Sequence, residues 1–237
     1  MLLSVVTISD GNPIDFERTF RSIDLTNSAI EWIVVNKSSK NLIEKTDNSL
    51  ELLNSGKNIF DAMNIGLINA RGELIIFMNA GDSFHEKTIP NAIISSYLEN
   101  KWAWAVGKTI RSDASIWDPK TLSKFKFQFG LNSYCHQSTV YETKLLREFH
   151  GFDDDSLVSD WIMSLRISKK IKPFLDSNIW SCYQINGISS RIKLFYKFKE
   201  YSRLKKKYNL SIFPLPIESA FQILLLIASY SRKYLNV

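Results

Sequence analysis

Apolar and polar residues alternate along the N-terminal part of the chain in the pattern of an α/β protein. Short apolar runs rich in β-branched residues predict buried strands at residues 2–8, 31–35 and 73–78. Between these runs, apolar residues recur at helical spacing over residues 14–25 and 59–70. Because strands and helices alternate in this order, we expect a doubly wound, mostly parallel central sheet with helices on both faces.

The pattern after residue 82 is looser but still predicts both kinds of element. The expected helices cover residues 88–98, 142–149 and 160–168. The expected strands cover residues 102–110, 135–141 and 179–185. Ser159 precedes the last helix and is a residue type that caps helix N-termini.

The basic charge of the chain is concentrated at its C-terminal end. The net charge is +6, and residues 191–237 contain ten Lys or Arg against two acids. Residues 191–208 predict a basic amphipathic helix, and residues 217–230 form an apolar stretch shorter than a spanning helix needs. We therefore divide the chain into a main domain, residues 1–190, and a helical tail, residues 191–237. The tail either packs on the core or lies on an anionic membrane surface, and no nucleic acid partner is expected.

Composition agrees with one globular core and a small appendage. The 237 residues are 45% hydrophobic and 23% charged, which is typical of a folded protein. Cys135 and Cys182 fit neither a metal-binding spacing nor a disulfide framework, which favours a reducing compartment. The first residues lack the basic segment and cleavage site of a signal peptide, so we expect a cytoplasmic protein.

The segment Asn79-Ala80-Gly81-Asp82 ends the apolar run of residues 73–78. An aspartate in this position lies at the carboxyl edge of a sheet, where open α/β sheets bind ligands. Its carboxylate can hold a hard divalent cation, which in turn can hold a diphosphate. Asn, Gly and Asp are also ordinary turn residues, so this segment alone leaves a simple turn as the alternative.

Several motifs together resemble the family 2 glycosyltransferases of the GT-A fold, especially the branch that builds bacterial surface polysaccharides of the colanic acid or O-antigen type. Their order and spacing match over about residues 2–207. In chain order the motifs are residues 3–8, 31–35, 59–66, 70–73, 79–82, 136–139, 151–153, 159–161 and 186–190.

The resemblance implies a GT-A catalytic domain over residues 1–190 and an inverting sugar transfer. The donor would be a nucleotide-sugar, with a UDP-sugar favoured, and the acceptor a glycan or polyprenyl-diphosphate-linked glycan at the inner face of the cell membrane. The family pattern makes Asp82 the ligand of a divalent cation, Mn²⁺ or Mg²⁺, and Asp160 the general base. Gly81 occupies the position of the second acid in the family's Asp-x-Asp pattern.

The resemblance also implies a set of residues that contact the donor. Asn36 stands where the family has an aspartate that accepts from the nucleobase, so uracil is favoured and guanine stays possible. Arg71 could pair with phosphate or be a surface charge. Asp61 could face the donor or cap its helix. The full set of expected donor contacts is Thr7, Ser9, Asn36, Asp61, Asn64, Arg71 and Asn79.

Two further features leave alternatives open. Asp153, Asp154 and Asp155 are rivals of Asp160 for the role of base, or else they form a solvated turn. His136 is either a buried histidine at a strand end or a contact to the acceptor or the diphosphate.

Other functions agree less well with the sequence. A nucleotidyltransferase usually has a Gly-rich phosphate loop with a lysine near its N-terminus, and residues 9–13 offer neither. A non-catalytic nucleotide- or polyanion-binding protein would use the basic tail, but the apolar stretch that follows favours lipid or packing instead.

Overall fold

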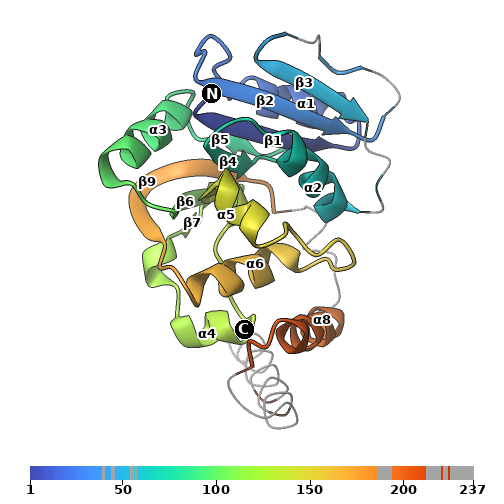
Figure 1. Ribbon diagram of the computed structural model, residues 1–237, viewed down its shortest axis with the longest axis vertical. Coiled ribbons are helices and arrows are strands. Elements are labelled where there is room, and N and C mark those ends of the chain that lie inside the picture. The colour runs from blue at the N-terminus through green and yellow to red at the C-terminus, as the bar shows by residue number, and fades with distance from the viewer. Residues whose placement is uncertain are drawn as a thin grey trace.

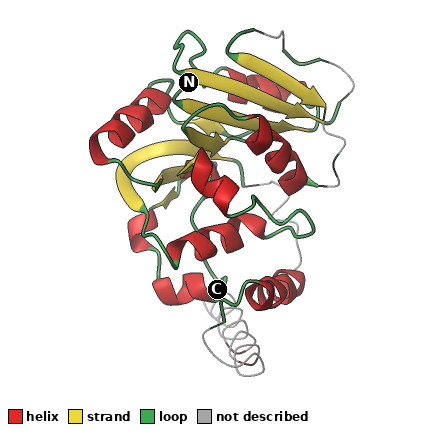
Figure 2. Ribbon diagram, viewed as in Figure 1, coloured by secondary structure: helices red, strands yellow, loops and turns green. Residues whose placement is uncertain are grey.

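The computed structural model describes residues 1–38, 41–43, 46–53, 56, 58–185 and 194–211, with Ala220 and Leu224. Within these residues, nine strands form one sheet in the order β3-β2-β1-β4-β8-β6-β9-β5, with β7 paired to β6 (Figures 1 and 2). The strands are β1 Leu3–Ser9, β2 Ile30–Asn36, β3 Ser49–Leu53, β4 Leu74–Phe77, β5 Ser83–Phe84, β6 Trp104–Arg111, β7 Ile116–Trp117, β8 Thr139–Glu142 and β9 Phe174–Tyr183.

The half of the sheet built by β1 to β4 is parallel. β1 pairs with both β2 and β4, and β2 pairs with β3. The carboxyl ends of these strands therefore meet at one edge. The other half is mixed, because β8 runs antiparallel to β4 and β6 while β9 runs parallel to β6. The α/β class expected from the sequence is confirmed, but the sheet as a whole is mixed rather than mostly parallel, since apolar periodicity does not reveal strand direction.

Helices cover both faces of the sheet (Figure 2). One buried cluster joins α1 and α3 to the sheet, and a second joins α2, α5 and α6 to its other face. Neighbouring residues such as Val5 and Val6 belong to different clusters, as the alternation of side chains along a strand requires. The α-helices are α1 Pro13–Phe20, α2 Ile59–Asn69, α3 Ile89–Asn100, α4 Lys124–Gln128, α5 Thr143–Glu148, α6 Ser159–Ser168 and α8 Leu194–Lys207, and the short 3₁₀ helices are η1 Pro119–Thr121 and η2 His136–Ser138.

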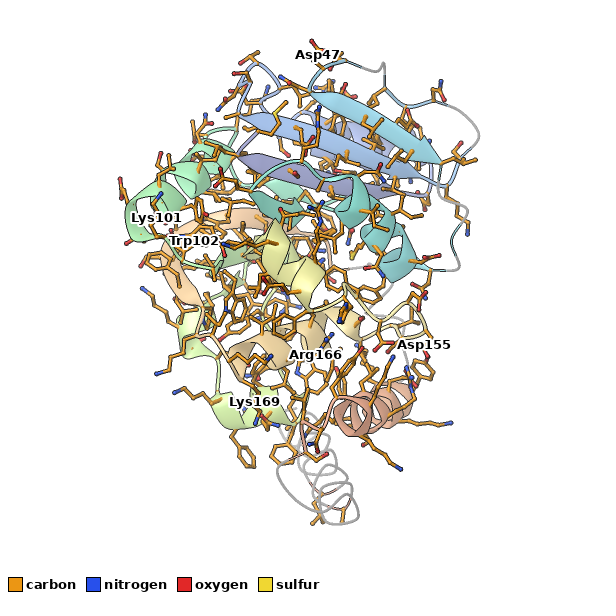
Figure 3. All side chains as sticks on the ribbon, in the orientation of Figure 1. Asp47, Lys101, Trp102, Asp155, Arg166 and Lys169 are labelled. Atoms are coloured by element: carbon orange, nitrogen blue, oxygen red, sulfur yellow. The ribbon has the colours of Figure 1, made fainter. Side chains whose placement is uncertain are left out.

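Helix α8 confirms the predicted basic amphipathic helix and packs on the main domain. Its apolar side joins a third buried cluster with α4 and α6. Lys207 and Tyr208 donate hydrogen bonds to the Asp153 carboxylate over 2.8 and 2.6 Å. Arg203 forms an ion pair with Asp155, which lies beside α8 (Figure 3). Asp153 is thus buried, and both of its carboxylate oxygens accept hydrogen bonds from the C-terminal end of α8. This arrangement fits neither a solvated turn nor a free base.

Some expectations lie outside the described residues. They are the loop at residues 186–190 and, apart from Ala220 and Leu224, the apolar stretch at residues 217–230. Across the described part of the chain, no helix combines the length and hydrophobicity needed to cross a bilayer. Cys135 and Cys182 are both free thiols, in agreement with the sequence.

The predicted caps were assigned to the wrong residues. Ser159 lies inside α6, whose N-cap is Val158, and its hydroxyl instead accepts a hydrogen bond from the backbone N–H of Asp153. Helix α2 is capped by Asn58, whose side chain accepts from the N–H groups of Phe60 and Asp61. Asp61 is therefore a first-turn acid and not the cap. β3 was not expected from the sequence.

Candidate active site

A cavity of about 850 Å³ lies at the carboxyl edge of the parallel half of the sheet. This volume is in the range of pockets that hold a small-molecule ligand or cofactor. Its walls come from the ends of β1, β2 and β4, from η2, and from α6 and α8. Of the site residues expected from the sequence, four line it: Ser9, Asn79, Asp82 and Asp160.

The turn after β4 is held in place by helix α1. The backbone N–H of Gly81 donates to the carbonyl of Asp15 over 3.0 Å. The hydroxyl of Thr19 donates to the carbonyl of Asp82 over 2.6 Å. Gly81 has a φ of +99°, which residues with a side chain rarely adopt. A second acid at this position would strain the turn, and this gives a physical reason for glycine there.

Asp82 is a buried carboxylate with both oxygens engaged. Oδ1 accepts from the backbone N–H of Gln184 over 2.9 Å, and Oδ2 accepts from Nε2 of Gln137 over 2.8 Å. Burial raises its pKa to about 7, although these two hydrogen bonds and the charge of Arg18 act in the opposite direction. The carboxyl group therefore titrates near neutral pH, and a cation bound beside it would stabilise its charged form.

Asp160 occupies the first turn of α6, as the sequence predicted. Its Oδ1 accepts from the backbone N–H of Trp161 over 2.8 Å. Lys197 and Tyr201 of α8 line the same cavity. Burial lowers the pKa of Lys197, while the nearby charge of Asp160 raises it.

The short helix η2 connects the two acids. Gln137 binds Asp82 directly, and the preceding residue, His136, lies close enough to Asp160 to feel its charge. The ring of His136 stacks on Phe77 with centroids 5.2 Å apart, and it meets the edge of Phe152 at 5.5 Å. A strand was expected over these residues, but the 3₁₀ turn directs consecutive side chains into one cavity.

Four residues expected to contact the donor have side chains that do not line the cavity. The hydroxyl of Thr7 is buried and accepts from the indole N–H of Trp32 over 2.9 Å. The amide of Asn64 brackets Phe152, donating to its carbonyl and accepting from its N–H, each over 2.8 Å. Asn64 therefore shapes the turn before α6.

Asn36 and Asp61 are the other two of these four. Nδ2 of Asn36 donates to Glu51 over 2.8 Å, and its Oδ1 accepts from the N–H of Ser38. Its neighbour Lys37 lines the cavity in its place. Asp61 lies in the first turn of α2 and is absent from the cavity wall.

Arg71 also lies outside the cavity lining, at the opposite edge of the sheet. It precedes β4, whereas Asp82 follows it. Its Nε pairs with Glu31 over 2.7 Å, and its Nη2 donates to the carbonyl of Asp47 over 2.8 Å. Asp47 is labelled at the end of the molecule far from α8 (Figure 3). The guanidinium of Arg71 therefore cannot reach a phosphate bound beside Asp82.

The structure adds cavity residues that the sequence did not indicate. Arg18 of α1, Lys37 after β2 and Lys197 of α8 contribute positive charges to its wall. Asp15 and Trp117 also line it. Of these, Lys197 had a usable signal, because it belongs to a helix whose basic character was visible. Arg18, Lys37 and Asp15 are ordinary surface residue types, and their place at the cavity follows only from the fold.

The chemistry of the site fits a divalent cation that is held mainly by the phosphate groups of a bound ligand. Within the described residues, no group of three or more His, Cys, Asp or Glu side chains could hold a metal. The Oδ1 atom of Asn79 is nevertheless buried without a hydrogen-bond partner there, and Asp82 follows it in the same turn. One carboxylate with an amide oxygen suits Mn²⁺ or Mg²⁺, because such ions are often bound by one or two protein oxygens plus substrate phosphates.

Solved structures similar to this chain share its fold. No protein-family model matches the chain. Two curated relatives, uncharacterized glycosyltransferases from two strains of Mycobacterium tuberculosis, are each 22% identical over 204 residues, covering 79% of this chain and 77% of the relative. The solved structure of S. aureus TarS in complex with UDP-GlcNAc is 17% identical with a TM-score of 0.67, covering 92% of this chain and 69% of that one.

The mannosyltransferase PcManGT from Pyrobaculum calidifontis, in complex with GDP-Man and Mn²⁺, is 11% identical with a TM-score of 0.58. The match covers 97% of this chain and 75% of that chain. These structures are GT-A glycosyltransferases, so the likeness shows that the chain has the GT-A fold. The fold expected from the sequence motifs is thereby confirmed.

Proposed function

We propose that this protein is an inverting glycosyltransferase that moves a sugar from a nucleotide-sugar to a hydroxyl group of a glycan or lipid-linked glycan. One observation carries the proposal. Asp82, at the carboxyl edge of the parallel strands, and Asp160, at the start of α6, line one cavity large enough for such a donor. The relatives named as glycosyltransferases and the shared GT-A fold support it.

The donor binds with its diphosphate toward Asp82. Ser9 and Asn79 contact it from the strand ends, and Arg18 and Lys37 supply positive charge on the same side of the cavity. A divalent cation, Mn²⁺ or Mg²⁺, bound by Asp82 neutralises the charge that grows on the leaving diphosphate. We favour a UDP-sugar because of the chain's resemblance to family 2 enzymes, and a GDP-sugar is the alternative.

Asp160 removes the proton of the attacking hydroxyl as the new bond to the anomeric carbon forms. Among the described residues that line the cavity, it is the only acid that comes from the α6 and α8 wall. A single base opposite the leaving group suits a one-step displacement with inversion, whereas a two-step mechanism would need a nucleophile on the same side as well.

The acceptor is a glycan carried on a polyprenyl diphosphate, and the reaction serves surface polysaccharide synthesis at the inner membrane face. Helix α8 supports this assignment, because it lines the cavity and carries exposed basic residues such as Lys199 and Lys206. Basic residues near a membrane surface are attracted to anionic lipids. The apolar stretch at residues 217–230 follows the same helix in sequence and would add hydrophobic contact.

The proposal is tested by measuring release of nucleoside diphosphate from UDP-GlcNAc and GDP-Man in the presence of Mn²⁺, with water as the slow acceptor. We expect Asp160→Asn to lower turnover by about 10²-fold or more while donor binding persists. Asp82→Ala should abolish the cation-dependent part of donor binding. Asp154→Asn is the matched control, because this exposed acid lies in the loop before α6. Unchanged turnover in the Asp160 variant would refute its role.

A further inference from the structure

His136 is a buried histidine with two unused hydrogen-bonding atoms. Its side chain lines the cavity and is 7% exposed. Neither Nδ1 nor Nε2 has a hydrogen-bond partner in the described part of the chain. Leaving a buried polar atom without a partner costs about 1–3 kcal/mol, so most such atoms in folded proteins are paired. An apolar side chain of similar shape would avoid this cost, and a ligand that bonds to the ring nitrogens would offset it.

The surroundings of the ring keep it in one orientation. Phe77 stacks against one face with an interplanar angle of 22°, and Phe152 meets it edge-on at 80°. Phe152 is itself held by the side chain of Asn64 through two hydrogen bonds. The imidazole is therefore fixed before any ligand arrives, which lowers the entropy lost on binding.

The chemistry of the ring favours a hydroxyl group over a phosphate. Burial lowers the pKa of His136, and the charge of Asp160 only partly opposes this shift. A neutral imidazole donates from one nitrogen and accepts at the other. Phosphate oxygens only accept, so they leave one ring nitrogen unpaired. A sugar carries hydroxyl groups that both donate and accept, and it can therefore pair both nitrogens.

The position of the ring agrees with a sugar site. The next residue, Gln137, binds Asp82, which faces the diphosphate in the function proposed above. On the other side the ring lies near Asp160, the proposed base. The sugar being transferred must lie between the leaving diphosphate and the base. We propose that the ring nitrogens of His136 bind hydroxyl groups of the donor sugar and so orient the anomeric carbon of the sugar toward the acceptor. This inference rests on the proposed function.

The experiment compares sugar-bearing and sugar-free ligands by calorimetry. UDP and UDP-GlcNAc form one pair, and GDP and GDP-Man the other, each with Mn²⁺. We expect His136→Phe to lower the affinity for the nucleotide-sugar that the wild type binds by about tenfold, which corresponds to roughly 1.4 kcal/mol of lost hydrogen bonding. The affinity for the matching nucleoside diphosphate should change less than about twofold. His136→Asn, which keeps a donor and an acceptor, should recover part of the loss.

Two controls separate binding from folding. The unliganded His136→Phe protein should melt at the same temperature as the wild type or higher, because two buried unpaired atoms are removed. His85→Asn, at an exposed histidine outside the cavity, should change the affinity for neither ligand. Equal weakening of both ligands, or of neither, would overturn the role of His136. If the wild type bound no nucleotide at all, the proposed function would fail together with this inference.

Discussion

Gln137 donates a hydrogen bond from its Nε2 atom to Oδ2 of Asp82 over 2.8 Å. The two residues are far apart in sequence but meet at one edge of the sheet, because Asp82 follows β4 and Gln137 precedes its antiparallel neighbour β8. With the backbone N–H of Gln184 on the other oxygen, the carboxylate is oriented by two donors while it remains buried. Its protonation therefore depends on a balance between burial, which favours the neutral form, and these hydrogen bonds.

The first prediction concerns the pH dependence of cation binding. The pKa of Asp82 is raised to about 7, so the carboxyl is protonated below neutral pH and a cation must displace that proton. We expect Mn²⁺-dependent binding of the nucleoside diphosphate to weaken by up to about tenfold for each pH unit below 7. Calorimetric titrations across this range measure the effect. Asp82→Asn should remove the pH dependence, and an unaltered profile in that variant would assign it to another group.

The same pKa shift predicts how stability changes with pH in the unliganded protein. The folded pKa lies above that of the unfolded chain, so the group stabilises the fold at low pH. This contribution is lost as pH rises through about 7. Relative to Asp82→Asn, the wild type should therefore lose melting temperature between about pH 4 and 7 and change little above that range. Thermal unfolding of both proteins over this range checks the sign.

The second prediction isolates the contribution of Gln137. Gln137→Met removes a hydrogen bond that lowers the pKa of Asp82, so the midpoint of the pH profile should move upward. Gln184→Met is the matched control, because Gln184 donates to Asp82 from its backbone and keeps that bond whatever its side chain. A midpoint that moves equally in both variants would contradict the argument.

The third prediction contrasts two arginines. Arg71→Ala should leave donor affinity unchanged, because Arg71 pairs with Glu31 at the edge of the sheet away from the cavity. Its partner Glu31 is buried but keeps hydrogen bonds from Ser4 and Gly72, so the cost in stability should be about 1–3 kcal/mol. Arg18→Ala removes a charge from the cavity wall and should weaken nucleoside diphosphate binding by about tenfold. Weaker binding in the Arg71 variant would restore the phosphate role suggested by the sequence.

The fourth prediction concerns the tail. A chain truncated after Ser211 keeps α8, which lines the cavity, and removes the apolar stretch. We expect it to retain nucleotide binding and to lose flotation with vesicles that contain anionic lipid. The full chain should float with these vesicles and less well with neutral ones. If truncation left flotation intact, the membrane contact would lie on α8 or elsewhere.

Much of the site could be predicted where its chemistry is local. The turn from Asn79 to Asp82 follows an apolar strand directly, so its position at the sheet edge is fixed by the chain itself. Asp160 begins a helix that the apolar spacing also predicts. For both residues, a few neighbours in sequence decide the backbone geometry.

The side-chain directions of the other expected donor contacts could not be inferred in this way. Thr7, Asn36 and Asn64 stand next to the correct strand ends or helix, but their side chains are bonded to Trp32, Glu51 and Phe152. Which way such a side chain points depends on partners far along the chain. The sequence contains those partners but gives no sign of which pairs meet.

Local sequence was enough to predict the alternating strands and helices, the acidic turn after β4, the helical start at Asp160 and the basic amphipathic helix α8, because each depends on residues close together in the chain. The fold was needed to reveal that half of the sheet is mixed, that α8 contributes Lys197 and Tyr201 to the cavity, and that Arg71 lies outside it. Those outcomes depend on long-range packing, in which strand direction and the meeting of distant side chains follow from burying apolar surface on both faces of one sheet.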